Sequence, residues 1–187
     1  DSAAAQGNVP AQLWATAERG TVQSQFKLGM LFLEGKTIPP DREQALTWLQ
    51  RAAEQKYAPA QFQVGFLRHQ AQNFTEAAKW YQLAADQGYA EAQANLGTLY
   101  ASGQGVVQDF TQAQAWYRKA AERGVAGAQF NLGMMYVEGA GVARDFLQAY
   151  AWFHLAAAQG MEHATIAKKQ LAEALTPEQI AEAETMS

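Results

Sequence analysis

Histidine is the residue type most often used for metal binding and proton transfer near neutral pH, and this chain has three. His69, His154 and His163 fall into no metal-ligand spacing such as H-E-x-x-H. His154 and His163 stand nine residues apart, across an expected helix end, with only Glu162 close by. The 187 residues include no cysteine, which excludes disulfides, thiolate zinc sites and cysteine nucleophiles. We therefore interpret the histidines as surface residues and expect no metal site.

Glycine-rich loops and aspartates are the next candidates for chemistry. The G-x-G pattern occurs at Gly103–Gly105 and Gly139–Gly141, and in other proteins such a pattern can hold a phosphate. Here it follows no expected strand and returns once per repeat, so we interpret it as a connection between helices. Asp41, Asp109 and Asp145 recur in the same register after such connections, which is typical of residues that cap a helix start. We expect no catalytic residue and no cofactor.

Four tryptophans could form a ladder that stacks on sugars or bases. Trp48, Trp80, Trp116 and Trp152 are separated by 32, 36 and 36 residues. Each stands on a stripe of alanines at helical spacing, as in Ala113/Trp116/Tyr117/Ala120/Ala121. A large ring beside small alanines lets neighbouring helices interlock. We therefore assign the tryptophans to the core.

The same spacing reveals four repeats, each made of two helices. The first helix of each repeat carries a central glycine, at Gly29, Gly65, Gly97 or Gly133. An interior glycine costs about 1 kcal/mol relative to alanine, so we expect it where the paired helix approaches closely. The second helix carries the tryptophan stripe. Because hydrophobic residues make up 49% of the chain and strong helix formers dominate, the sequence predicts an all-α protein.

The ends of the second helices share a stop signal. Gly88, Gly124 and Gly160 each stand eight residues after a tryptophan, where a left-handed residue closes a helix. Lys56 occupies the same place in the first repeat, so we expect a positive φ there.

The domain organisation follows from this register. We expect a single array over residues 10–187, with repeats at about 24–59, 60–91, 92–127 and 128–163. Half-repeats at 10–23 and 164–187 should cap it, and residues 1–9 should be a flexible segment. Lys168 and Lys169 stand at core positions of a fifth repeat, so no further repeat should pack there. Thr176 and Gln179 predict a capping box before a short last helix.

Charge argues against a nucleic-acid partner, and hydropathy argues against a transmembrane helix. The formal net charge is −4 and no block of Lys or Arg occurs, which argues against nucleic-acid binding. No stretch approaches the 18 or so uninterrupted apolar residues that a transmembrane helix needs.

The repeat resembles the Sel1-like family, a subclass of the tetratricopeptide-like α-solenoids. The shared pattern is A-x-x-x-L-G-x-x-Y-x-x-G-x-G-V-x-x-D-x-x-x-A-x-x-W-Y-x-x-A-A-x-x-G. The third repeat supplies it from Ala92 to Gly124. The second repeat lacks the G-x-G-V loop and has Arg68 in place of a tyrosine, and the fourth has Phe153 in place of the later tyrosine. The resemblance implies a right-handed α-solenoid of antiparallel helix pairs.

The resemblance also implies where a partner would bind. In such solenoids the first helices line a concave groove, and residues beside the central glycine face into it. At these positions stand Phe26, Lys27, Met30, Phe62, Gln63, Phe66, Asn95, Thr98, Phe130, Asn131 and Met134. An aromatic and methionine stripe edged with amides suits a hydrophobic peptide or partner helix. Alternatively, the three phenylalanines that precede the glycines fill space between successive repeats.

These observations favour a non-enzymatic module that binds another protein or peptide. An envelope scaffold, a chaperone-like adaptor and an immunity protein all fit this description, and an envelope-associated enzyme or carbohydrate-binding protein is the alternative from another class. The start at Asp1, without Met, suggests an exported protein of a bacterium, with a cytoplasmic location as the alternative. The sequence does not indicate an oligomeric state.

Overall fold

The alanine-rich periodic segments all fold as helices in the computed structural model, which describes residues 9–36 and 38–186. All regular structure in these residues is helical, which confirms the all-α prediction. The chain divides into two compact units, residues 1–89 and 90–187. The segment predicted to be flexible, residues 1–9, lies outside the described residues except for Val9, which is buried.

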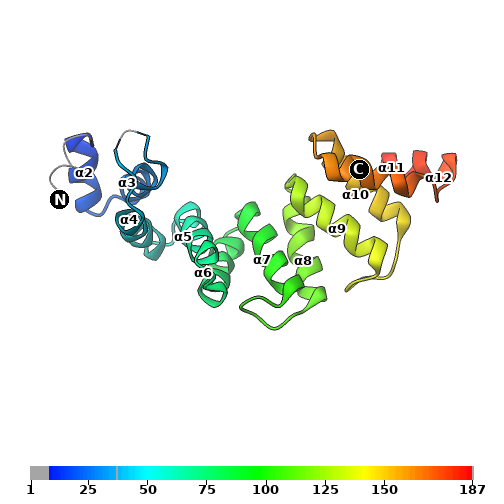
Figure 1. Cartoon of the computed structure of the whole chain (residues 1–187), viewed down its shortest axis with the longest axis horizontal. Helices are drawn as coiled ribbons and strands as arrows, with labels where there is room; N and C mark the ends of the chain where they lie inside the picture. The colour runs from blue at the N-terminus through cyan, green and yellow to red at the C-terminus, as the bar shows by residue number, and fades with distance from the viewer. Residues whose placement is uncertain (1–8, 37, 187) are drawn as a thin grey trace. The chain divides into compact units, whose positions relative to one another are not determined.

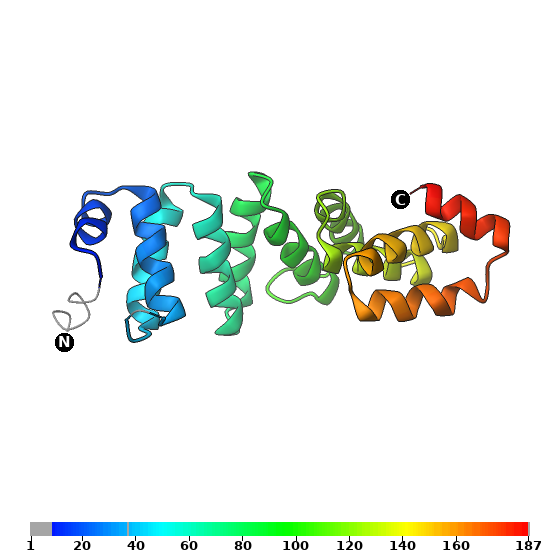
Figure 2. The same ribbon diagram turned by 90° about the horizontal axis from the view of Figure 1, so that it is seen from above.

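Unit 1 begins with the half-repeat helix α2 (Ala11–Glu18). Two helix pairs follow, α3 (Val22–Glu34) with α4 (Arg42–Glu54) and α5 (Ala58–Gln70) with α6 (Phe74–Asp86). Figures 1 and 2 show them as successive antiparallel pairs, with α4 packed against α5. Among the connections within a helix pair, the one between α5 and α6 is the shortest, as expected from the missing G-x-G-V loop.

Unit 2 contains two pairs and a cap. The pairs are α7 (Ala90–Ser102) with α8 (Phe110–Ala121) and α9 (Ala126–Glu138) with α10 (Phe146–Ala158). The cap consists of α11 (Glu162–Ala172) and α12 (Pro177–Thr185), both of which pack on α10. Leu171 and Ala183 close the core from these two helices, while Lys169 is exposed.

Side-chain caps begin several helices at the residues that the sequence predicted. The Asp41, Asp109 and Asp145 carboxylates each accept two backbone N–H bonds at the start of a second helix. Thr176 and Gln179 form the predicted capping box. Lys56 has φ +63°, as predicted from its register with the three terminal glycines. Gln72, in the shortened loop, has φ +59°, which the sequence pattern did not indicate.

The central glycines lie where the paired helix approaches most closely. A Cβ at Gly29 would stand 2.7 Å from the Leu49 side chain, and one at Gly65 would stand 2.7 Å from Tyr81. In unit 2 the same contact joins Gly97 to Tyr117 at 2.8 Å. Real Cβ atoms do not tolerate such distances to a packed side chain, so the interior glycines have the predicted structural reason.

The tryptophan stripe belongs to the core, as predicted, but unevenly. Trp48 and Trp116 are buried, whereas Trp80 and Trp152 are half-buried and pack against core clusters. The Arg51 guanidinium lies 4.4 Å from the Trp48 ring centre, and the Lys119 amine lies 3.9 Å from that of Trp116. At these distances each cation is attracted to the face of its indole.

Each first helix has a buried glutamine near its start, and within each unit such a glutamine couples neighbouring helix pairs. Gln25, Gln61, Gln93 and Gln129 are buried. The Nε2 of Gln61 donates to the backbone oxygen of Ala53, at the end of α4, over 3.1 Å. Its Oε1 accepts from Nε2 of Gln87, beyond α6, over 2.6 Å. In unit 2, Gln129 makes the equivalent bonds with Ala121 and Gln159.

Candidate functional site

The predicted partner-binding residues lie on one side of the first helices α3, α5, α7 and α9, which we call the first-helix face of each unit. Lys27, Phe66 and Thr98 are exposed, and the other eight are half-buried: Phe26, Met30, Phe62, Gln63, Asn95, Phe130, Asn131 and Met134. Their neighbours along each helix, such as Leu28 and Leu132, are buried. The stripe therefore stands at the border between core and surface.

In unit 1 the phenylalanines partly fill the space between repeats. The Phe62 ring lies 5.1 Å from that of Tyr89 and 5.9 Å from that of Tyr81. Phe26 meets Tyr57, the residue before α5, edge-on at 5.3 Å. Phe66 stacks on Phe62 but keeps 38% of its surface exposed. The same rings therefore pack between repeats and keep some accessible surface, and their role in binding a partner stays a prediction.

In unit 2 two of the predicted polar residues, exposed Thr98 and half-buried Asn131, bond one side chain of the fold. The Tyr117 hydroxyl on α8 donates to Oγ1 of Thr98 on α7 over 3.0 Å. It also bonds the side chain of Asn131 on α9. Burial of the ring raises the pKa of Tyr117, and these two hydrogen bonds partly offset that rise. We call this contact the polar bridge of α7, α8 and α9.

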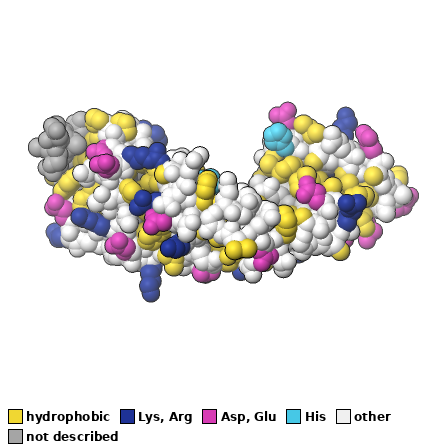
Figure 3. Space-filling view, turned by 60° about the horizontal axis from the view of Figure 1, so that its bottom comes forward, with side chains coloured by type: hydrophobic (Ala, Val, Ile, Leu, Met, Phe, Trp, Pro, Cys, Tyr) yellow, Lys and Arg dark blue, Asp and Glu magenta, His cyan; other side chains and the backbone are white. Residues whose placement is uncertain are grey.

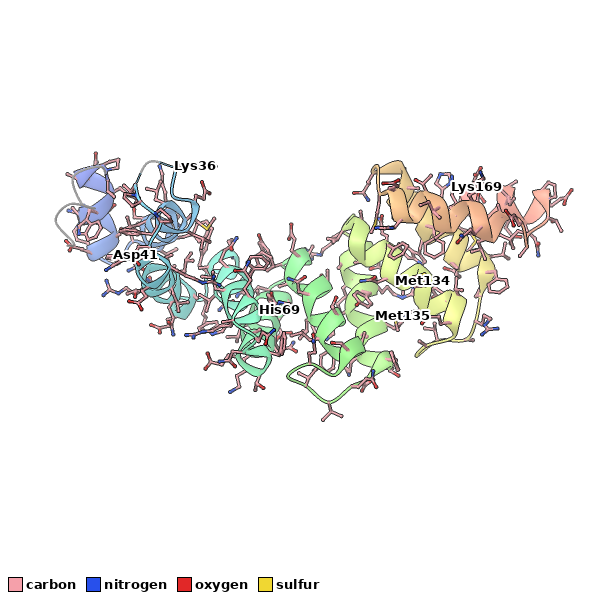
Figure 4. All side chains as sticks on the ribbon, viewed as in Figure 1. Lys36, Asp41, His69, Met134, Met135 and Lys169 are labelled. Carbon is pink, nitrogen blue, oxygen red and sulfur yellow. The ribbon has the colours of Figure 1, made fainter. Side chains whose placement is uncertain are left out.

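A cavity of about 250 Å³ opens where the next repeat lacks such a bridge. It is lined by Met134 and Val137 of α9, Phe153 of α10, and Ala167, Gln170 and Leu171 of α11. Figure 4 labels Met134 on α9. Of the six lining residues, sequence reasoning had singled out only Met134 for the groove. We call this cavity the α9–α11 pocket.

A second cavity, of about 230 Å³, lies between α4 and α5 in unit 1. Leu46 and Leu67 contribute to its walls, together with two arginines. Arg42 donates from Nη2 to the Gln70 amide oxygen over 2.9 Å, and Arg68 Nε lies 3.2 Å from the Glu76 carboxylate. Both cations already have partners, and the carboxylate of Glu43 is the third charged group of the lining.

Two of the three histidines are less exposed than the sequence predicted. His163 is exposed, but His69 is half-buried with its ring 5.1 Å from that of Phe74. His154 is half-buried as well, with Nδ1 3.4 Å from the Glu184 carboxylate. Each packs against an aromatic or acidic residue of an adjoining helix, which the spacing could not show. No group of three or more His, Cys, Asp or Glu in the described residues has metal-binding geometry.

The surface carries both signs of charge. On the face that Figure 3 shows, Lys or Arg and Asp or Glu side chains alternate, with apolar atoms between them. None of the described helices is long and apolar enough to cross a membrane.

The paired helices, the glycine contacts and the glutamine bonds between pairs define a tetratricopeptide-like helical repeat protein. Four copies of the Sel1 repeat match the chain, at residues 22–57, 58–89, 90–125 and 126–161. The chain therefore belongs to the Sel1 repeat family. Each copy begins two residues before the repeat boundary inferred from the sequence. Proteins with this repeat are generally non-enzymatic interaction modules.

Solved structures of bacterial relatives share the fold. A protective antigen present in uropathogenic Escherichia coli strains is 37% identical over 94% of this chain, with a TM-score of 0.88. A Sel1 repeat protein from Oxalobacter formigenes is 32% identical over 80% of the chain, with a TM-score of 0.75. The chain spans only 38% and 63% of these two proteins.

More distant similarity concerns the fold alone. An immunity protein from Pseudomonas aeruginosa is 21% identical, covers 81% of this chain and 58% of its own, and has a TM-score of 0.53. No curated protein matches the chain significantly.

Proposed function

We propose that the chain is a non-enzymatic interaction module whose first-helix face binds a partner protein or peptide. One observation carries the proposal. Every aromatic and methionine side chain predicted for that face keeps part of its surface accessible, as Phe66, Met30 and Met134 illustrate. Accessible apolar side chains grouped on repeat helices favour a partner that covers them.

Several roles remain within this proposal. A scaffold, a chaperone-like adaptor and an inhibitor of the immunity type would all use an accessible apolar stripe. The similarity to an immunity protein is too low in sequence identity to favour that role over the others. The alternative, an envelope-associated enzyme or carbohydrate-binding protein, stays a prediction, and turnover or sugar binding measured on the full chain would favour it over the interaction module.

Export to the bacterial envelope stays a prediction for the natural protein. Fractionation of the source cells tests it. Recovery with the periplasmic or secreted proteins would support export, and recovery with the cytoplasm would contradict it.

The binding proposal can be tested with a displayed library of short random peptides selected on the full chain. Hydrogen exchange then locates the bound peptides. We expect slowed exchange on first helices, and binding that falls at least about tenfold in a Phe66→Ser/Met134→Ser variant. Both side chains stand at the border of the core, so helicity should be retained.

A matched control replaces two exposed apolar side chains outside the first helices. Leu83 on α6 is 47% exposed and Val107, in the loop before α8, is 89% exposed. A Leu83→Ser/Val107→Ser variant should bind the selected peptides as the parent does. Protection of second helices or loops instead, or an effect of the control equal to that of the first variant, would contradict the proposal.

A further inference from the structure

The side chain of Met134, on α9, lines a cavity large enough to admit a small oxidant. Met134 is half-buried and belongs to the wall of the α9–α11 pocket, whose volume is about 250 Å³. A water molecule takes up roughly 30 Å³ in the liquid, and hydrogen peroxide is only one oxygen atom larger. Hydrogen peroxide therefore has room to enter the pocket and to reach this side chain.

The next residue along α9, Met135, has the opposite surroundings. It is 5% exposed and belongs to the hydrophobic core of unit 2. A thioether is oxidised only where the oxidant reaches its sulfur, so burial protects Met135 while the pocket leaves Met134 open to attack. The two neighbours thus carry the same chemical group on one helix and differ in access.

The pocket also has room for the oxidised product. Oxidation converts the apolar thioether into a polar sulfoxide with one additional oxygen. Of the six lining residues Gln170 alone is polar, and its amide N–H can donate to that oxygen. Thr98 holds the equivalent position in the preceding repeat, 36 residues earlier, and its Oγ1 accepts from the Tyr117 hydroxyl. A polar oxygen at this register is compatible with a helix pair, so we expect the oxidised chain to stay folded.

We propose that Met134 is a reversible oxidation site whose sulfoxide weakens binding at the first-helix face of unit 2. In the forward step the O–O bond of hydrogen peroxide breaks, an S–O bond forms at Sδ, and water leaves. The sulfur loses two electrons and the peroxide gains them. In the reverse step, catalysed by a methionine sulfoxide reductase, two thiols become a disulfide and the oxygen leaves as water.

The effect on binding rests on the proposed function, because it requires a partner on this face, whereas the oxidation does not. Five of the six lining residues are apolar, and Met134 is one of them. Covering an apolar side chain is favourable, but covering a sulfoxide costs free energy unless the partner supplies a hydrogen bond. Peptides that contact Met134 should therefore bind the oxidised chain more weakly.

The first measurement maps oxidation on the full chain. Brief treatment with dilute hydrogen peroxide, followed by digestion and tandem mass spectrometry, gives the rate at each methionine. We expect Met134 to be oxidised at least about tenfold faster than Met135, with the helicity unchanged. Equal rates, or slower oxidation of Met134, would overturn the oxidation site whatever the chain binds.

The second measurement uses library peptides that protect α9 and not α3. The parent chain should lose affinity for them severalfold on oxidation and regain it after treatment with a methionine sulfoxide reductase and a dithiol. Met134→Leu cannot form a sulfoxide at this position, so its affinity, whatever its starting value, should not respond to the oxidant. Met186→Leu is the matched control: it removes an exposed methionine beyond α12 and should respond as the parent does.

The outcomes separate this inference from the proposed function. An equal loss of affinity in the parent and in Met134→Leu, or no loss in a parent whose Met134 is fully oxidised, would overturn the effect on binding. The proposed function would stand, since binding before oxidation tests it independently. Peptides that protect other first helices but never α9 would overturn the effect in the same way. If no peptide protects a first helix, the proposed function is wrong as well, while the mass spectra still decide the oxidation site.

Discussion

At the scale of single residues, buried glutamines bond neighbouring helix pairs within each unit. An amide that both donates and accepts can bond two neighbours at once, and Gln61 uses both functions, on Ala53 and Gln87. A buried polar group contributes most when its partners are also removed from water. The A-Q start of each repeat is visible in the sequence, but its partners stand 8 and 26 residues away and become apparent only in the fold.

We expect Gln61→Leu to lower the free energy of unfolding by about 1–3 kcal/mol, because the Ala53 carbonyl and the Gln87 amide lose their partner. Leucine is close to glutamine in size and helix propensity, so packing and propensity change little. The measurement is chemical unfolding followed by circular dichroism. Gln112→Leu, at an exposed position of α8, is the control and should stay within about 0.5 kcal/mol of the parent. Equal stability of the two variants would show that the amide bonds contribute nothing net.

At the scale of helices, α9 contains two glycines with opposite surroundings. A Cβ at Gly133 would stand 2.6 Å from the ring of Phe153, which is buried. A Cβ at Gly127 would meet nothing within 4 Å. The same substitution in one helix therefore separates the cost of close packing from the benefit of a better helix former.

We expect Gly133→Ala to destabilise the protein by about 1–3 kcal/mol, because α9 and α10 must move apart. Gly127→Ala should instead stabilise it by up to about 1 kcal/mol, through lower entropy of the unfolded chain. Thermal unfolding of both variants against the parent measures the two signs. A stable Gly133→Ala variant would mean that the Phe153 ring can shift, and the close approach would then not explain the central glycine.

The helices themselves could be predicted from local signals. Aspartate caps, the tryptophan–alanine stripe and the terminal glycines act within a few residues, so the pattern around Asp109 and Trp116 places α8 closely. The accessible stripe was predicted as a set, from its register beside the glycines. The polar bridge and the α9–α11 pocket were not, because they depend on three residues from three helices. One lining residue of the pocket, Phe153, was nevertheless visible in the sequence as a departure from the tyrosine of the repeat.

At the scale of the whole molecule, the chain folds into two compact units, whereas the periodic sequence predicts a single array. The sequence predicts one continuous array because the four repeats share one sequence pattern. The structure defines the two compact units by the contacts within each, so the single array stays a prediction. Both tyrosines with raised pKa values, Tyr117 and Tyr150, belong to unit 2. A change in their ionisation should therefore act on the stability of that unit.

Alkaline pH should show the effect of tyrosine ionisation on the stability of unit 2. Burial is the main cause that raises the pKa of Tyr117, and burial followed by the Glu184 carboxylate raises that of Tyr150. The fold therefore favours the neutral phenols. Their contribution to stability is complete below the ordinary tyrosine value of 10.0 and is lost as the pH rises through the higher folded values.

We therefore expect the free energy of unfolding to fall as the pH is raised from neutral to about 11. Tyr117→Phe/Tyr150→Phe should lose stability at neutral pH, because the bonds to Thr98 and Glu184 are absent, yet should lose less than the parent on going to alkaline pH. Urea unfolding at several pH values, followed by circular dichroism, measures both slopes. Parallel slopes for parent and variant would show that other groups cause the alkaline loss. A shallower slope in the variant would assign that loss to the two phenols, one at the polar bridge and one at the contact between α10 and α12.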